Sequence, residues 1–105
     1  MVFNTGAALL DAIVLAAVHK EPEGTYGYKI TQEAREVLEL SESTLYPVLR
    51  RLQKDGCLET YDMDFGGRNR RYYKITEKGK KQLMTYAQEW SSYSGKITKL
   101  FEEVM

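Results

Sequence analysis

The sequence predicts an α+β, mostly helical fold: a winged helix-turn-helix (α-α-α-β-β) followed by a long C-terminal dimerisation helix. Three observations predict it. Apolar residues recur with helical spacing in three segments before residue 56. Two segments rich in β-branched and aromatic residues then flank Gly66-Gly67, a typical hairpin signal. From Leu83 onward an apolar residue returns every seven positions. In such a fold the third helix enters a DNA groove and the hairpin forms the wing.

Composition restricts the class of protein. The 105 residues fit one folded unit, and 15 Lys and Arg cancel 15 Asp and Glu. A uniformly basic nucleic-acid binder would have a net positive charge, so any electrostatic function must come from the distribution of charge. The single cysteine, Cys57, excludes an internal disulfide and fits a reducing cytoplasm. The apolar run 7–18 is interrupted by Asp11 and is too short to span a bilayer. We expect a cytoplasmic protein with no membrane partner.

The first two helices are expected at 6–20 and 25–40. The first is apolar on most sides, which places it in the centre of the core, and Pro22 and Gly24 end it. The second has outward-facing acidic residues and an apolar face. Its apolar positions are Ile30, Ala34, Val37 and Leu38, and its acidic positions are Glu33, Glu36 and Glu39.

The third helix, expected at 41–56, has one apolar and one polar face. At about 100° per residue, a narrow apolar stripe contains Leu45, Val48, Leu49 and Leu52. The candidate DNA-binding residues occupy or border the other face: Ser43, Thr44, Tyr46, Arg50 and Lys54. Hydroxyls, an aromatic ring and cations suit phosphates and base edges, although any solvated helix also has a polar face. Pro47 belongs in a first turn, so the helix should begin near Ser43 or Thr44, or be kinked.

The hairpin that follows, with strands at 57–65 and 70–76, is strongly basic. Between residues 68 and 81 the basic residues are Arg68, Arg70, Arg71, Lys74, Lys78, Lys80 and Lys81, against the single acid Glu77. The segment from residue 21 to residue 42 is acidic, because it contains six glutamates and only two basic residues, Lys29 and Arg35. Arginines on a two-stranded ribbon can reach phosphates or a minor groove, and the alternative is a solvated hairpin whose charges serve solubility.

The last segment, from Thr76, predicts a helix with an apolar seam. The seam consists of Leu83, Tyr86, Trp90, Tyr93, Ile97, Leu100 and Val104, widened by Ala87 and Phe101. A domain this small has little core left to cover the seam, so the expected partner is a second copy of the chain. Gly95 interrupts the helix at a cost of about 1 kcal/mol relative to alanine and marks a possible bend.

Two motifs carry a family resemblance. "STLYPVLRRLQKDGCLE" followed by "GGRNRRYYKITEKGKKQL" resembles the PadR family of transcriptional regulators, with matching patterns at 45–56 and 67–79, and "YGYKI" at 26–30 resembles the entry to its second helix. The resemblance implies a homodimeric repressor that binds an inverted-repeat operator. It places Arg68, Asn69 and Arg70 at a DNA-facing wing tip turned by Gly66 and Gly67, with Tyr73 and Ile75 packed on the core.

The resemblance has departures and a further implication. Asn69 stands where the family commonly has proline, which predicts a looser tip. With one helix after the wing, the chain is similar to the small family members, some of which bind drug-like compounds. This implies a planar aromatic effector near the dimer axis, between Trp90 and residues of the first helix such as Leu9, Asp11 and Ala12. The alternative is two tryptophans packed together without a cavity.

Catalysis is not expected. One histidine, His19, and one cysteine make no convincing metal or nucleophile site, and the glycine pair lacks the spacing of a phosphate loop. We therefore predict no enzyme activity, no cofactor and no metal. The expected division is a DNA-binding domain at 1–76 and a dimerisation helix at 77–105. The alternative function is a winged-helix module that binds protein instead of DNA.

Overall fold

The computed structural model describes residues 6–105; residues 1–5, with which the expected N-terminal domain begins, lie outside the described part. The elements are α1 (Ala7–His19), β1 (Thr25–Tyr26), α2 (Gly27–Arg35), α3 (Glu42–Lys54), β2 (Leu58–Phe65), β3 (Arg68–Ile75) and α4 (Glu77–Glu102). The predicted order of helices and hairpin is confirmed, with one added strand. No helix within residues 6–105 has both the length and the apolarity needed to cross a membrane.

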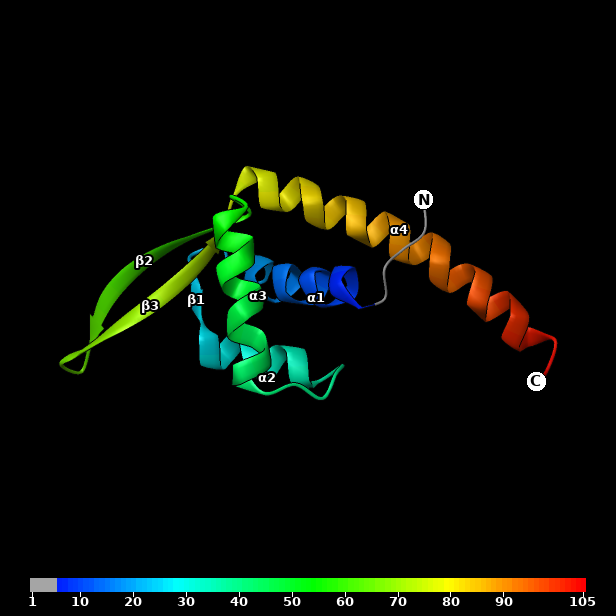
Figure 1. Cartoon of the computed structure of the whole chain (residues 1–105), viewed down its shortest axis with the longest axis horizontal. Helices are drawn as coiled ribbons and strands as arrows, with labels where there is room; N and C mark the ends of the chain where they lie inside the picture. Colours follow the sequence, from blue (N-terminus) through cyan, green and yellow to red (C-terminus); the bar gives the residue numbers. More distant parts are fainter. Residues whose placement is uncertain (1–5) are drawn as a thin grey trace.

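The core surrounds α1. In Figure 1 the other elements lie around this helix, with the hairpin projecting from one side of the molecule and α4 from the other. Val14, Leu15 and Val18 of α1 are fully buried, as expected for a helix that is apolar on most sides. The remaining core comes from α2, α3 and the base of the hairpin: Ile30, Ala34, Leu45, Val48, Leu49, Leu52, Cys57, Leu58, Tyr73 and Ile75.

The short strand β1 was missed by the sequence analysis, which placed residues 25 and 26 in a helix. Thr25 and Tyr26 pair with Tyr73 and Tyr72 at the free edge of β3, giving an antiparallel sheet of order β1-β3-β2. Threonine and tyrosine favour extended backbone, and the β3 edge supplies the pairing.

The second helix also ends earlier than expected, so the predicted range 25–40 is wrong at both ends. After Arg35 the N–H groups of Val37 and Leu38 both bond to the carbonyl of Ala34, at 3.1 and 3.0 Å. Val37, expected on the apolar face of this helix, is 66% exposed. The helical spacing of apolar residues therefore continues to Leu38, whereas the helix itself ends at Arg35.

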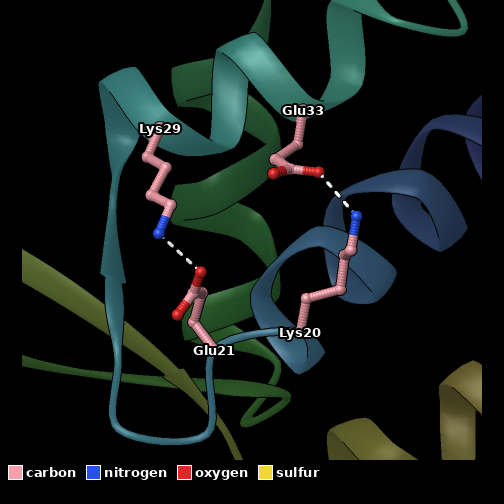
Figure 2. A network of polar contacts seen from close by, with 4 residues as sticks. All are labelled: Lys20, Glu21, Lys29 and Glu33. Carbon is pink, nitrogen blue, oxygen red and sulfur yellow. Dashed lines mark hydrogen bonds and ion pairs between the residues drawn. The ribbon is translucent and has the colours of Figure 1, made fainter.

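Two ion pairs connect the end of α1 with α2, as Figure 2 shows. Lys20 Nζ lies 2.8 Å from Glu33 Oε2, and Lys29 Nζ lies 2.5 Å from Glu21 Oε1. The hydrogen bond with Glu33 raises the pKa of Lys20, and the same bond lowers the pKa of Glu33. Such exposed pairs stabilise little, but they neutralise part of the acidic segment.

The third helix, α3, begins at Glu42, within the expected range 41–56 and slightly before the start near Ser43 or Thr44 that Pro47 suggested. Ser41 caps it, since its hydroxyl accepts the N–H of Thr44 at 3.3 Å. Pro47 is therefore the sixth helical residue instead of lying in the first turn, and it leaves the carbonyl of Ser43 without its usual helical donor. The predicted apolar stripe is confirmed, because its four residues are all buried: Leu45, Val48, Leu49 and Leu52.

The hairpin is confirmed, and it is paired up to its turn. Register runs from Leu58 opposite Ile75 to Phe65 opposite Arg68, so β3 begins two residues before its expected start. Gly66 and Gly67 have φ values of +58° and +83°, as a two-residue hairpin turn with both central residues left-handed requires.

The last helix is the longest element. Thr76 caps α4 by accepting the N–H of Gly79 at 3.0 Å. The N-terminal part of α4 packs against the core through Leu83 and Tyr86, whereas its C-terminal half, orange to red in Figure 1, extends beyond the rest of the chain. Gly95 lies inside α4 without ending it.

Gly79 allows α4 to approach the strand bases closely. A Cβ at this position would lie 2.2 Å from the Cys57 carbonyl oxygen and 2.8 Å from a side-chain carbon of Ile75. We expect Gly79→Ala to reduce the free energy of unfolding by about 1–3 kcal/mol, because the backbone of residue 57 must move. Urea unfolding measures this. Gly95→Ala, which meets nothing within 4 Å, is the matched control and should stabilise; equal stability of the two variants would contradict the close contact.

Candidate nucleic-acid interface

A groove of about 570 Å³ lies between the hairpin and the helices. It follows the edge of β3 beyond the end of β1 and reaches the start of α2 and Tyr46 of α3. Its lining consists of Tyr26, Gly27, Tyr28, Tyr46, Phe65, Arg68, Asn69, Arg70, Arg71 and Tyr73. Of the residues predicted on the third helix only Tyr46 lines this groove, together with the predicted wing residues Arg68, Asn69 and Arg70.

The polar face of α3 is largely exposed. Ser43, Thr44, Arg50 and Lys54 are all open to solvent. The hydroxyls of Ser43 and Thr44 lie 2.8 and 3.1 Å from the hydroxyl of Ser41, so they form a small cluster at the helix N-terminus. Hydroxyls at this end and cations along the same helix provide donors suited to phosphate oxygens and base edges.

Tyr46 differs from the other candidates on α3. It is half-buried and packs against the core, with its ring over the backbone of Gly27. A Cβ on Gly27 would lie 2.5 Å from the Tyr46 hydroxyl oxygen. Tyr46 therefore holds the start of α2 against α3, and only its outer part lines the groove.

The three wing arginines have different surroundings. Arg68 is exposed, as is the neighbouring Asn69. The guanidinium carbon of Arg70 lies 4.2 Å from the centre of the Tyr26 ring and 4.0 Å from that of Phe65. Arg71 pairs instead with Asp62, at 3.2 Å.

Sequence reasoning missed Tyr26 and Phe65 as parts of this surface. Strand alternation could have identified Phe65, because Phe65 lies directly opposite Arg68 and thus on the same face as Arg70. Nothing in the local pattern points to Tyr26, whose place depends on the unpredicted strand β1.

Asp11, which we expected near an effector, connects three helices within the chain. Its carboxylate oxygens accept hydrogen bonds from Arg51 of α3 at 2.8 and 2.7 Å, and the Tyr86 hydroxyl of α4 lies 3.4 Å away. Asp11 is 5% exposed, so this pairing compensates a buried charge. Burial and then the Asp11 carboxylate raise the pKa of Tyr86. The sequence analysis had assigned no role to Arg51.

The predicted seam of α4 divides into two parts. Leu83 and Tyr86 pack against the core of their own chain. Further along, Trp90, Leu100 and Val104 are 41%, 64% and 84% exposed, whereas Tyr93 between them is half-buried. The Trp90 and Tyr93 ring centres are 6.1 Å apart, and Ile97 is half-buried. The candidate effector residues Leu9 and Ala12 of α1 are also half-buried.

Cys57 is buried immediately before β2, which begins at Leu58, one residue later than expected. It is 4% exposed, and burial raises the pKa of its thiol. A raised pKa keeps the sulfur protonated, which disfavours nucleophilic or redox chemistry.

Comparison with known proteins decides the family. The model of the PadR-like family of transcriptional regulators matches residues 14–85, which is more than half of the chain. The chain belongs to the PadR-like family. The match extends from the middle of α1 through the wing into the start of α4, so the groove lies entirely within it.

Solved structures agree with this assignment. A protein from Streptococcus mutans has a TM-score of 0.84 at 39% identity, covering 97% of this chain and 94% of that one. A PadR family transcription regulator from Clostridium difficile has a TM-score of 0.78 at 28% identity, over 88% and 97% of the two chains. A PadR-like regulator from Bacillus cereus has a TM-score of 0.78 at 30% identity, over 89% and 91%.

Two curated relatives add sequence similarity. An uncharacterized protein from Lysinibacillus sphaericus is 37% identical over 100 residues, which cover 90% of this chain and 88% of that protein. A transcriptional regulator from Mycobacterium tuberculosis is 38% identical over 66 residues, or 62% of each chain. This PadR-like chain is thus a transcriptional regulator with the winged-helix fold.

Proposed function

We propose that this PadR-like regulator is a cytoplasmic repressor that binds an inverted-repeat DNA operator as a homodimer. The observation that carries the proposal is the groove in which Tyr46 of α3 meets the basic residues of β3, next to an exposed polar face of α3. A helix in the major groove and a ribbon beside it need this arrangement. The family match supports regulation of transcription as the outcome.

The residue roles follow from exposure on α3 and from position at the groove. Ser43, Thr44, Arg50 and the outer part of Tyr46 are proposed to contact base edges or nearby phosphates, and Lys54 to contact phosphate at the far end of α3. On the wing the proposed DNA contacts are Arg68, Asn69 and Arg70. Arg71 is already paired with Asp62, so it is not proposed as a contact.

The charge distribution supports this orientation. The wing and the start of α4 are basic, whereas α2 and its flanks are acidic and partly neutralised by their own lysines. DNA therefore experiences attraction at the wing and repulsion from the acidic segment. Although the net charge is zero, the separation of basic and acidic segments gives the protein an electric field that favours DNA on the wing side.

Dimerisation is proposed through α4, with residues 1–76 as the DNA-binding part and 77–105 as the dimerisation helix. In the outer part of the seam Trp90, Leu100 and Val104 are exposed and Tyr93 and Ile97 are half-buried, and Phe101 beside it is 60% exposed. Contiguous apolar surface on one helix is typical of an interface. Leu83 and Tyr86 would join the interface only at their outer edges.

An effector is proposed at the dimer axis, where two Trp90 rings and the α1 residues Leu9 and Ala12 would form an apolar slot for a planar aromatic compound. Such a compound would bind one arrangement of the two subunits more tightly than the other. If it favours the arrangement that cannot bind DNA, operator affinity falls by the ratio of its two affinities at most.

Sedimentation and fluorescence test the dimer and the effector together. We expect a dimer at micromolar concentration and quenching of Trp90 by planar cationic dyes, and Trp90 is the only tryptophan of the chain. Leu100→Glu should produce monomers, because it places a charge in the seam. A dimer whose tryptophan is quenched by no dye would leave Trp90 as interface core, and a monomeric wild type would remove both proposals.

Specific DNA binding is tested by gel shift. The probe is the promoter fragment upstream of the chain's own gene, with a random duplex of equal length as control. Retention of the promoter at a protein concentration that leaves the random duplex free would support the repressor. No shift of either duplex would favour the protein-binding alternative.

A further inference from the structure

Arg70 has a more constrained environment than any other cation bordering the groove. Its guanidinium lies over two aromatic rings that come from distant parts of the chain, Tyr26 at the end of β1 and Phe65 at the end of β2. The side chain is half-buried, whereas that of Arg68, two residues closer to the turn, is exposed. Two rings within 4.2 Å restrict a long and otherwise mobile side chain.

The Tyr26 ring is itself fixed. Tyr26 packs edge-on against Tyr72 at 5.7 Å, and Tyr72 stacks on Tyr61 at 5.4 Å with the rings 9° from parallel. The Tyr61 hydroxyl donates to the carbonyl of Glu23, ahead of β1. A row of three tyrosines therefore joins the base of the wing to the start of α2.

The row also connects with the third helix. Gly27 follows Tyr26 directly, and the ring of Tyr46 from α3 covers it. A contact between Arg70 and Tyr26 thus fixes a wing cation relative to the DNA-facing helix. Phe65 holds the same cation from the wing side, with 58% of its own surface exposed.

We propose that Phe65 and Tyr26 are positioning residues that hold the Arg70 guanidinium at the groove for contact with DNA. The inference rests on the proposed function and deepens it: Arg70 is the preorganised contact of the wing and Arg68 the mobile one. Neither ring needs to touch DNA. Each acts through Arg70, by reducing the side-chain freedom that would otherwise disappear on binding.

The chemistry requires arginine at position 70 in particular. A guanidinium is planar, stacks on aromatic faces and keeps its N–H groups in a fixed fork, whereas an ammonium is a compact and strongly hydrated charge. Arg70→Lys should therefore weaken DNA binding clearly. Arg68→Lys, the same substitution at an exposed site, is the matched control and should have little effect.

A double-mutant cycle tests the positioning role. The variants are Phe65→Leu, Arg70→Ala and their combination, and binding to the labelled promoter fragment is measured by fluorescence anisotropy. We expect Phe65→Leu to lower the affinity about two- to fivefold, the size of an exposed cation–π contact. In the Arg70→Ala background the same substitution should change nothing, and Phe65→Tyr, which keeps a ring, should retain wild-type affinity.

The outcomes separate the inference from the function on which it rests. If Phe65→Leu weakens binding equally with and without Arg70, Phe65 contacts DNA itself and the positioning role is wrong. If Phe65→Leu leaves affinity unchanged, or lowers only the melting temperature, the stack is merely structural and the inference is also wrong. If the wild type binds no promoter DNA, both the inference and the repressor function fail.

Discussion

Leu49→Ala is expected to reduce the free energy of unfolding by about 2–5 kcal/mol, the range for truncation of a fully buried leucine. Leu49 has no exposed surface and lies in the apolar stripe of α3, among residues of α1, α2 and the hairpin base. Removing its branched carbons leaves a cavity that these packed elements cannot fill. Urea or thermal unfolding measures the loss.

Arg50→Ala is the matched control, one position along the same helix. Arg50 is exposed, so this variant should unfold as the wild type does. It should instead reduce discrimination between the promoter and random DNA. If Arg50→Ala destabilised the fold and left DNA binding intact in the folded fraction, the assignment of the two faces of α3 would be wrong.

Arg68→Ala combined with Arg70→Ala is expected to lower DNA affinity by about a hundredfold or more. Hydrogen bonds to charged groups contribute about 1.5–3 kcal/mol each, and the two substitutions remove two cations from every wing. The loss should be similar for operator variants if both arginines contact phosphates, because phosphate contacts carry no sequence information. Anisotropy titrations against several duplexes measure it.

The control for the wing variant is Lys80→Ala with Lys81→Ala, which removes the same charge from the start of α4. Both lysines are exposed and neither lines the groove. This variant should bind nearly as the wild type does. Equal losses for the two pairs would mean that only total charge matters, and an unchanged affinity of the arginine variant would show that the wing does not contact DNA.

The predictable part of the fold consists of features with local signals. Helical spacing identified the stripe from Leu45 to Leu52, and Gly66-Gly67 identified the hairpin, because backbone with positive φ at both turn positions favours glycine strongly. The family resemblance likewise placed Tyr73 and Ile75 on the core side, and both are buried.

The features that the sequence analysis missed depend on contacts between distant segments. The strand β1 exists because β3, nearly fifty residues later, offers an edge for pairing. The bond between Asp11 and Arg51 joins residues forty positions apart. Neither pairing produces a periodic pattern in the sequence, because the partners are distant in the chain and meet only in the folded structure.

The candidate site was predicted in outline and not in its internal organisation. The cations of α3 were predicted from their place on the polar face of the helix, and those of the wing from the basic run around the hairpin turn. The different states of Arg68, Arg70 and Arg71 did not, because each depends on a cross-strand or β1 neighbour. Similarly, heptad spacing identified the α4 seam, but only the structure shows that Leu83 and Tyr86 pack against the core of their own chain.

The central claim, that this regulator binds DNA through its basic wing and third helix, is tested most directly by the salt dependence of promoter binding. The logarithm of the wild-type association constant should fall linearly with the logarithm of salt concentration, by about 0.9 for each phosphate contact. In the Arg68/Arg70 variant the slope should be smaller by roughly one unit for every phosphate that the two arginines neutralise in the wild type. An affinity that does not depend on salt, or equal slopes for the wild type and the variant, would contradict the account.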